Sequence, residues 1–451
     1  MRRFILDLLK TWVASPERKP LLLRGARQVG KTFVLQELGR TAFSGSVHLV
    51  DFEQRPDLAP LFERDLVPKR IIAELEVAMG SHIAPGRDLL VLDEIQACPR
   101  ALVSLKYFAE QLPELHVAAA GSLLEFALAD RHFSFPVGQV QPVHLFPMSF
   151  PEYLAAMGND AALETVLAAP RELSAVAHSA LMEQVRLYCR IGGMPAAIKA
   201  YRAQNNSLLA AERVQAALLT TYRADFAKYR PRVDPRCLDT VLGSIARTVG
   251  RQTIYTRLAP DFTGPTIKAA FDALENAGVV RRIRAVSTTA LPLAAAASAR
   301  RFKPLFLDVG LLQHVAGLTA DIGLERDGLL DSFAGALTEQ LVGQELLARA
   351  DPLLAPQLYY WTRAARSSQA EIDYLLVAGG RAHPVEVRNA RVGGMQSMRV
   401  LLREQPGLAP GYVLSAEPYA VDPRRGVVRL PLYYAAALTQ MLGSAEPAHA
   451  G

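Results

Sequence analysis

One eight-residue segment near the start of the chain constrains its fold more than any other feature. Residues Gly25-Ala26-Arg27-Gln28-Val29-Gly30-Lys31-Thr32 follow the pattern G-x-x-x-x-G-K-[ST]. An apolar strand pattern at 21–23 precedes them. A helical pattern at 33–38 follows and is expected to stop at Gly39. A strand–loop–helix unit of this kind is typical of a nucleotide-binding parallel sheet.

The chemistry of this loop suits a nucleoside triphosphate. Its backbone N–H groups turn toward phosphates, and the N-terminus of the following helix adds partial positive charge. The glycines allow close approach of the backbone and positive φ. We expect Lys31 to reach the β- and γ-phosphates and Thr32 to place its hydroxyl on Mg²⁺.

A second apolar run, 89–92, ends in two acids, Asp93 and Glu94. The C-terminal ends of buried parallel strands face the ligand in folds of this type. We expect Asp93 to bind Mg²⁺, directly or through water, and Glu94 to polarise the water that attacks the γ-phosphate. A third strand pattern, 116–120, leads to Ser122. This serine either contacts the γ-phosphate or water, or caps the next helix.

Length and composition favour a large protein of two or three domains, since 451 residues exceed a single core. No apolar stretch reaches the ~20 residues that a membrane-spanning helix needs. Asp7 and Lys10 interrupt an export-like start. Three widely spaced cysteines form neither a disulfide framework nor a metal motif. The sequence therefore predicts a cytoplasmic protein with no membrane contact.

The charge balance leaves the partner open. A formal charge of +6 permits nucleic-acid binding without requiring it, and no long block of one sign marks a binding tail. Two helix patterns at 244–249 and 265–274, followed by strand patterns at 278–283 and 301–307, fit a winged-helix unit. Such a unit binds DNA or contacts protein.

Proline and glycine punctuation predicts the domain boundaries. Prolines end the strand–helix alternation near residue 150. A region of helical patterns follows, and Gly192-Gly193-Met194-Pro195 interrupts it. The expected units are a P-loop ATPase domain (1–150), a helical linker or lid (151–235), a winged-helix-like domain (236–325) and a nuclease-like α/β domain (326–451).

The last unit carries a second group of acids. Glu339 lies in a helical pattern, Asp373 in a strand pattern, and Glu386 in the next strand, two residues before Arg388. An acid followed on the next strand by acid-x-lysine is typical of metal-dependent nucleases, in which Asp373 and Glu386 would hold Mg²⁺. Here arginine takes the place of lysine, and a guanidinium is a poor substitute for a compact ammonium beside a metal-bound hydroxide. The alternative is a nuclease-like architecture without the chemistry.

Several segments together resemble the bacterial and archaeal AAA-family ATPases that join a P-loop domain to a C-terminal domain of unknown function. The resemblance implies ATP as the nucleotide. It also implies an α/β fold with an N-terminal parallel sheet of the AAA/ASCE P-loop NTPase type, a helical and winged-helix middle, and a restriction-endonuclease-like C-terminal module. The segments that carry it are 25–32, 92–96, 120–122, 146–153, 192–195, 306–312, 371–373 and 384–387.

The sequence departs from that family at Gln139, where the family usually has an arginine, and at Arg388. The first change is expected to slow hydrolysis, unless Arg100 or Arg131 replaces the missing cation. We therefore expect an ATP-binding ATPase that hydrolyses slowly and works as a conformational switch. The alternatives are an ATP-regulated nuclease and a silent scaffold. The partner, DNA or an unidentified protein, and self-association of the chain stay open.

Overall fold

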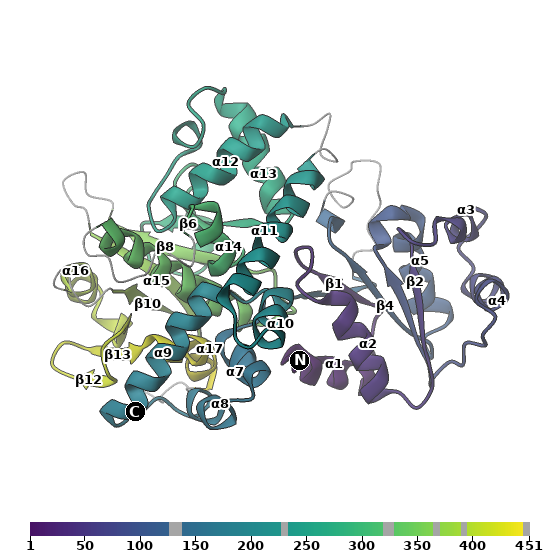
Figure 1. Ribbon diagram of the computed structural model, residues 1–451, viewed down its shortest axis with the longest axis horizontal. Coiled ribbons are helices and arrows are strands. Elements are labelled where there is room, and N and C mark those ends of the chain that lie inside the picture. Colours follow the sequence, from purple (N-terminus) through teal and green to yellow (C-terminus); the bar gives the residue numbers. More distant parts are fainter. Residues whose placement is uncertain (126–137, 227–232, 319–328, 364–369, 389–394, 445–451) are drawn as a thin grey trace.

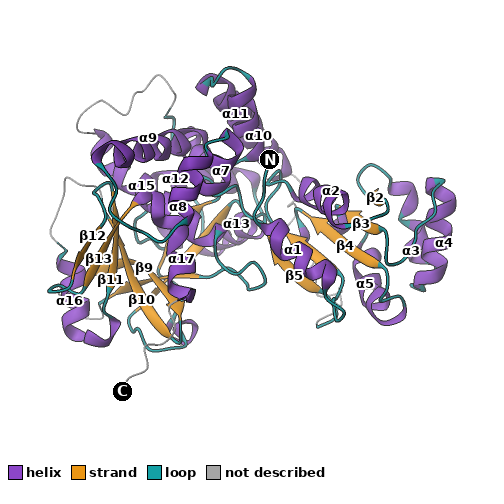
Figure 2. Cartoon of the chain, turned by 90° about the horizontal axis from the view of Figure 1, so that it is seen from below, coloured by secondary structure: helices purple, strands orange, loops and turns teal. Residues whose placement is uncertain are grey.

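The computed structural model describes residues 1–125, 138–226, 233–318, 329–363, 370–388 and 395–444. Figure 1 shows one sheet with its helices at the right of the molecule and a larger sheet at the left. Helices of the middle region lie between the two sheets, and Figure 2 shows the same division from below. In the described part of the chain, no helix is both long enough and apolar enough to cross a membrane.

The N-terminal sheet is parallel and has five strands in the order β2-β3-β4-β1-β5. Because β4 lies between β1 and β3, the phosphate loop and the acid pair follow strands that are not neighbours. This arrangement confirms the predicted parallel P-loop sheet. The strands are β1 (Leu21–Arg24), β2 (Val47–Asp51), β3 (Leu89–Asp93), β4 (His116–Gly121) and β5 (Gln141–His144).

Side chains of these strands alternate between two apolar layers, as the pleat of a strand requires. Leu21 and Leu23 pack with α1 and α2 on one face, whereas Leu22 packs with α4 and α5 on the other. Complete burial of one such side chain is worth about 1.5–3 kcal/mol. The helices are α1 (Ile5–Ala14), α2 (Lys31–Ala42), α3 (Pro60–Glu63), α4 (Pro68–Met79) and α5 (Pro99–Gln111).

The helix after the loop does not stop at Gly39, so that prediction was wrong. The helix α2 continues to Ala42. A Cβ atom added at Gly39 would lie 2.0 Å from Cγ2 of Val47 on β2. The glycine therefore allows the helix to approach the sheet closely, and this use of glycine leaves no mark in the local sequence.

The middle of the chain is helical, as predicted. Ser149 and Glu152 form a reciprocal capping box at the start of α7. Gly192 has φ of 74° and ends α9, and Pro195 begins α10. The helices are α7 (Phe150–Met157), α8 (Asp160–Leu167), α9 (Ala175–Ile191), α10 (Pro195–Ala203), α11 (Leu208–Asp225), α12 (Pro235–Thr248), α13 (Gly264–Asn276) and α14 (Val309–Val315).

The second sheet is mixed and has eight strands in the order β12-β13-β11-β10-β9-β8-β6-β7. β6 and β7 pair antiparallel, as the wing pattern predicted. β6 also pairs parallel with β8, so the hairpin belongs to the large C-terminal sheet. The strands are β6 (Val280–Val286), β7 (Phe302–Phe306), β8 (Leu358–Thr362), β9 (Glu371–Ala378), β10 (Arg381–Val387), β11 (Gly411–Ser415), β12 (Ala420–Asp422) and β13 (Val427–Pro431).

Three helices accompany this sheet. α15 runs from Leu329 to Ala348 and contacts β7, β10, α14 and α17. α16 (Gln396–Glu404) buries Met398 and Leu401 in an apolar cluster with β9 and β11 residues. α17 (Ala435–Ser444) packs on α15 and β9.

Candidate functional site

The lysine of the phosphate loop is folded back on the loop itself. Nζ of Lys31 donates hydrogen bonds to the carbonyl oxygens of Gly25 and Ala26, at 3.0 and 2.9 Å. Lys31 is buried, and burial lowers the pKa of its ammonium to about 8. Phosphate oxygens would be stronger partners than these neutral carbonyls, because both partners would then be charged.

The backbone of the loop takes conformations that few residues adopt. Gly25 and Gly30 have φ of 157° and 98°, and Gln28 has φ of 62°. A Cβ at Gly25 would lie 2.3 Å from the carbonyl oxygen of Leu145, so no larger residue fits there. The two glycines of the motif therefore allow a tight turn and a close approach to β5.

Thr32 and Asp93 meet at the start of α2 and the end of β3. Oγ1 of Thr32 donates a 2.5 Å hydrogen bond to Oδ2 of Asp93. Burial raises the pKa of Asp93, whereas the hydrogen bonds from Thr32 and from the backbone N–H of Glu94 lower it. Mg²⁺ in nucleotide sites takes oxygen ligands from one or two carboxylates and from substrate phosphates. The hydroxyl and the carboxylate fit that requirement.

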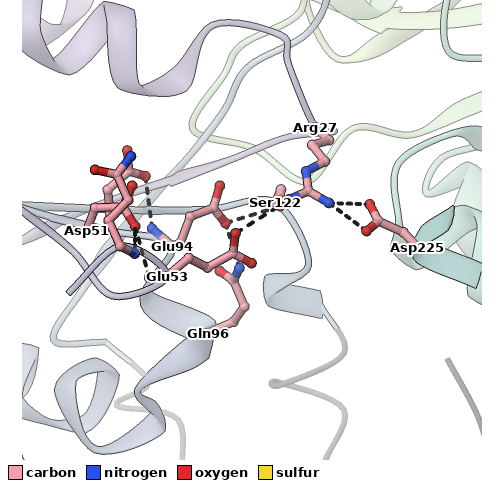
Figure 3. Close-up of polar contacts among 9 residues, drawn as sticks. Arg27, Asp51, Glu53, Glu94, Gln96, Ser122 and Asp225 are labelled. Carbon is pink, nitrogen blue, oxygen red and sulfur yellow. Dashed lines mark hydrogen bonds and ion pairs between the residues drawn. The ribbon is translucent and has the colours of Figure 1, made fainter. Parts of the chain in front are cut away.

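Glu94 lies beside Asp93 in a strained conformation and is held by two side chains. Its φ of 46° is left-handed, which is uncommon for a residue with a Cβ and is frequent at functional sites. Oε2 of Glu94 accepts hydrogen bonds from Nε2 of Gln96, at 2.6 Å, and from Oγ of Ser122, at 3.2 Å (Figure 3). The contact with Ser122 joins the ends of β3 and β4 and was not predicted from the sequence.

Arg27 connects the loop to the middle of the chain. Nη1 of Arg27 lies 2.6 Å from both carboxylate oxygens of Asp225 at the end of α11, and Nη2 lies 3.5 Å from Glu53 (Figure 3). The hydroxyl of Tyr222 on α11 donates a 2.7 Å hydrogen bond to the carbonyl oxygen of Arg27. Asp225 and Tyr222 were not predicted to lie at the site, because they follow the loop by almost 200 residues.

Arg3 holds the other side of the loop. Its guanidinium donates hydrogen bonds to the carbonyl oxygens of Val29 and Phe146, both at 2.7 Å, and to Oε1 of Glu152 at 3.0 Å. Arg3 is almost fully buried. Arg3, which belongs to the export-like start of the sequence, therefore has a structural role: it joins the loop to the start of α7.

An apolar cavity of about 570 Å³ opens beside the second glycine of the loop. Its walls include Gly30 and Phe33 at the start of α2, and Met148 and Pro195 from the middle region. Arg3, Lys199 and Arg202 are the charged residues that line it. An apolar cavity with cationic groups at its edge, beside a phosphate loop, suits the base and sugar of a nucleotide.

Comparison with known protein families agrees with this geometry. Residues 17–154 match the sequence model of an AAA domain. This part of the chain therefore has both the sequence pattern and the parallel sheet of an AAA-type P-loop domain. Residues 182–322 and 334–434 match two domains of unknown function, DUF8612 and DUF4143. No match was found among curated proteins.

Solved structures that resemble the chain are distant from it. A Walker-type ATPase of Pyrococcus abyssi is 15% identical, with 69% of this chain and 96% of that chain covered and a TM-score of 0.44. The ORC2 protein of Aeropyrum pernix, as an ADPNP–ADP complex, is 12% identical over 71% and 93%, with a TM-score of 0.36. RuvB of Thermotoga maritima is 16% identical over 62% and 87%, with a TM-score of 0.26.

Arg100 is held away from the phosphate loop and does not replace the arginine expected at position 139. Nε of Arg100 donates to the carbonyl oxygen of Phe62 at 2.8 Å and lies 3.5 Å from Glu63, which keeps it at the outer helices. Arg131 lies outside the described residues. The two arginines that the sequence suggested as replacements therefore gain no support.

The C-terminal acids surround a lysine that the sequence did not reveal. Nζ of Lys303 on β7 lies 2.8 Å from Glu339, 2.6 Å from Glu371 and 2.9 Å from Asp373. Lys303 is fully buried and also lies over the ring of Tyr360. Burial disfavours the charged lysine, but the three carboxylates outweigh it and raise the pKa of Lys303.

Glu386 and Arg388 lie next to this cluster. Nε of Arg388 is 3.4 Å from Oε1 of Glu386, and burial raises the pKa of Glu386 to about 7. Oδ2 of Asp373 accepts the backbone N–H of Val387 at 2.8 Å. The structure therefore brings Glu339, Asp373 and Glu386 to one region, as predicted, but places a lysine among the carboxylates. Within the described residues, no set of three or more acidic, histidine or cysteine side chains is arranged to hold a metal ion.

Buried polar contacts connect the P-loop domain to the helix that carries Glu339. Glu345, two turns further along α15, accepts the backbone N–H of Phe150 at 2.9 and 3.0 Å and the hydroxyl of Tyr188 at 3.1 Å. Phe150 begins the helix whose Glu152 holds Arg3, and Arg3 holds the loop. The chain of contacts from the phosphate loop to the C-terminal acids is therefore continuous through folded backbone.

We expect Glu345 to make the free energy of unfolding depend on pH. Burial raises its pKa to about 8, above the value of about 4.5 expected in the unfolded chain. The folded protein then retains a proton that the unfolded chain releases, so this contribution to stability is lost as pH rises through that window. Glu345→Gln keeps an acceptor for Phe150 and has no proton to lose. Its Tm relative to the natural protein should rise between pH 5.5 and 8.5, as measured by thermal unfolding.

The control is Glu183→Gln, which changes a glutamate exposed on α9. Its Tm difference from the natural protein should stay constant over the same range. A constant difference for Glu345→Gln as well would contradict the assignment of a protonated Glu345.

Proposed function

We propose that this protein binds ATP with Mg²⁺, hydrolyses it slowly, and uses the nucleotide as a conformational switch that acts on its C-terminal module. The observation that carries the proposal is the placement of five side chains at one edge of the parallel sheet. Lys31 and Thr32 begin α2, Asp93 ends β3 and bonds Thr32, and Glu94 bonds Ser122 at the end of β4.

The chain's own groups divide the work of hydrolysis. Lys31 exchanges the carbonyl oxygens of Gly25 and Ala26 for phosphate oxygens. Thr32 and Asp93 supply oxygen ligands for Mg²⁺, which neutralises phosphate charge when bound. Glu94, oriented by Gln96 and Ser122, accepts a proton from the attacking water. The hydrogen bond from Ser122 keeps the carboxylate of Glu94 beside the loop.

The contacts of the loop with distant segments support the switch. Arg27, Val29 and Ala26 each touch another part of the chain: α11, Arg3 and the turn between α13 and β6, respectively. A Cβ at Gly278 in that turn would lie 3.2 to 3.3 Å from three atoms of Ala26, so the turn lies directly on the loop. Movement of the loop on phosphate binding therefore shifts the contacts of the loop with the middle region and with the turn before β6, which is a strand of the large sheet.

Two of the segments that resemble the AAA-family ATPases, 192–195 and 306–312, also contact each other. Oδ2 of Asp308 accepts the backbone N–H of Gly193 at 2.5 Å, while Oδ1 caps α14 through Gly310 and Leu311. A Cβ at Gly192 would lie 2.2 Å from Asp308. The segment after α9, which lines the cavity beside the loop through Pro195, is thus bonded to the segment that follows β7. This bond supports transmission between nucleotide and C-terminal module.

Phosphate release measured with Mg²⁺ and with EDTA tests the proposal. We expect turnover that requires Mg²⁺ and ATP. A folded protein that binds no nucleotide would reject it, and tight ATP binding without any turnover would favour the silent scaffold.

We expect no metal-dependent cleavage of DNA by the C-terminal module. The ammonium of Lys303 already contacts Glu339, Glu371 and Asp373, and arginine occupies position 388. Supercoiled plasmid incubated with Mg²⁺ or Mn²⁺ should stay intact. Arg388→Lys would show whether the substitution at position 388 alone blocks cleavage, since lysine is the compact cation that such sites use.

Asp373→Ala is the matched control for that experiment. Cleavage by the natural protein that disappears in Asp373→Ala would contradict this expectation and would establish the nuclease. Cleavage that survives in Asp373→Ala would come from a contaminant.

A further inference from the structure

The positive charge of the chain is concentrated in one unit. Residues 234–306, the basic unit, contain 11 lysines and arginines and 5 aspartates and glutamates. Their net charge of +6 equals that of the whole chain, so the remaining residues together are neutral. Within the unit, α12 packs on α13 and β7, and α13 packs on β6; Figure 1 shows both helices above β6. The excess charge therefore belongs to one compact part of the fold.

Three acids of the basic unit already have a cationic partner. Asp272 and Glu275 both bind Arg282, at 2.7 and 2.8 Å. Asp239 lies 2.7 Å from Arg223 on α11. These carboxylates therefore do not neutralise the exposed arginines of the unit.

Six arginines of the basic unit are exposed, and in the described part of the chain their side chains make no hydrogen bond or ion pair. They form what we call the arginine surface: Arg247, Arg251, Arg257, Arg284, Arg300 and Arg301. The first two lie at and just after the end of α12, and Arg257 ends the 3-10 turn Tyr255–Arg257.

Backbone pairing brings much of the arginine surface together around β7. Arg284 on β6 lies opposite Phe302 of β7, and Thr253 pairs with the same Phe302 from the other side. Arg301 directly precedes Phe302, and Arg251 lies two residues before Thr253. Neighbouring strands are only ~4.8 Å apart. Like charges at such separations repel one another, and a polyanion would relieve that repulsion.

The arginine surface borders the acid cluster of the C-terminal module. A Cβ at Gly250 would lie 2.9 Å from Oε2 of Glu339, and the hydroxyl of Tyr360 donates a 3.1 Å hydrogen bond to Gln252. Bare carboxylates at this border would repel a polyanion. The ammonium of Lys303 lies within 2.9 Å of three of them and offsets part of their charge. The lysine that opposes metal binding therefore makes this border more favourable for an anion.

The basic unit presents no platform on which unpaired bases could stack. Residues 234–306 are all described by the structure, and none of their aromatic rings is exposed. Phe271 and Phe302 are buried with their ring centres 4.9 Å apart, and the ring of Tyr255 lies 5.0 Å from that of Phe302. Proteins that bind single strands combine a basic groove with exposed aromatic rings. Unpaired arginines without such rings suit the phosphates of a duplex.

We propose that the arginine surface binds the phosphate backbone of a nucleic-acid duplex, and that it does so without a metal ion. A planar guanidinium makes paired hydrogen bonds with phosphate oxygens, which favours arginine for this role. A DNA duplex carries one negative charge per ~1.7 Å of its axis, a regular density that arginines from several segments can engage at once. Carboxylates on an acidic protein have no such regular density. The proposal does not depend on nucleotide binding, so it stands or falls separately from the proposed function.

Fluorescence anisotropy of a short labelled DNA duplex, with EDTA and without nucleotide, tests the proposal. The affinity of the natural protein is expected to fall by about 10²–10³-fold between ~50 and ~200 mM salt, as for about four to six phosphate contacts. Arg284→Gln/Arg301→Gln removes two neighbouring guanidinium groups. Its affinity at ~100 mM salt should be at least about tenfold weaker, and its slope of log affinity against log salt should be about two smaller in magnitude.

Arg87→Gln/Arg424→Gln is the matched control, because it removes the same charge from exposed positions outside the basic unit. It should bind the duplex as the natural protein does. Thermal unfolding shows whether each variant is folded. If Arg284→Gln/Arg301→Gln is not folded, Arg247→Gln/Arg251→Gln, at the other side of β7, replaces it with the same expected losses. A folded variant of either pair with the natural affinity and salt slope would overturn the proposal.

Two further probes decide what kind of polyanion is bound. An RNA duplex of the same sequence distinguishes the two sources of a phosphate backbone, and preferential binding of either duplex supports the proposal. Single-stranded DNA that binds as tightly as the duplex would overturn it. Polyglutamate that displaces the duplex at an equal concentration of charge would also overturn it, and would indicate an acidic protein as the partner.

Discussion

Lys31→Ala is expected to weaken ATP binding at least ~100-fold, which corresponds to about 3 kcal/mol. The variant removes the one ammonium that the loop holds in readiness, bonded to the carbonyl oxygens of Gly25 and Ala26. Burial lowers the pKa of the Lys31 ammonium to about 8, so the two carbonyl oxygens stabilise its charged form only weakly. Phosphate oxygens would stabilise that charged form better. Isothermal titration with ATP and Mg²⁺ measures the effect.

Lys10→Ala is the control, because Lys10 is an exposed lysine on α1. It should bind ATP as the natural protein does. Thermal unfolding must show that Lys31→Ala is folded before its affinity is interpreted. A folded Lys31→Ala protein with affinity within about threefold of the natural value would refute the assignment of the phosphate site.

Glu94→Gln is expected to separate binding from turnover. Glutamine keeps an oxygen that accepts hydrogen bonds from Gln96 and Ser122, but it cannot take a proton from water. ATP affinity should therefore stay near the natural value while turnover falls by about 10²–10⁴-fold, the usual contribution of a general base. Steady-state phosphate release and ATP titration on the same preparation measure both quantities.

Glu110→Gln, at an exposed position on α5, is the control and should hydrolyse ATP normally. Natural turnover by Glu94→Gln would mean that another group activates the water. Loss of binding together with turnover would instead assign Glu94 to the structure of the site. In the expected case, the trapped ATP state also allows recovery of the partner that prefers it.

The nucleotide site was predictable because its signals are local. The eight loop residues and the pair Asp93 and Glu94 each lie within one short segment, and a parallel sheet brings such segments together at one edge. Even the order of the strands leaves this outcome unchanged, because every strand of the sheet points the same way. The match of residues 17–154 to an AAA domain agrees with the predicted P-loop sheet, and the roles of the individual site residues stay predictions.

Groups that hold the site from a distance were not predictable. Arg3 reaches Val29 and Glu152, and Asp225 reaches Arg27, across separations of up to 198 residues. Lys303 lies in a short strand pattern without any neighbouring acid in the sequence. A buried lysine within a strand is rare unless it is paired, and that was the one signal that pointed to a charged cluster. Its partners depend on the fold of the whole C-terminal sheet.

The shared sheet limits how this chain can be divided. The two matched domains of unknown function end at residue 322 and begin at residue 334, yet β6 of the first pairs with β8 of the second. A gene fragment that starts at 334 would produce β8 with an unpaired edge, and such edges promote aggregation. The complementary fragment would carry β6 and β7 without the strands that support them. Fragments for expression, and any recombination that preserves folding, should therefore keep residues 182–434 together as one inherited unit.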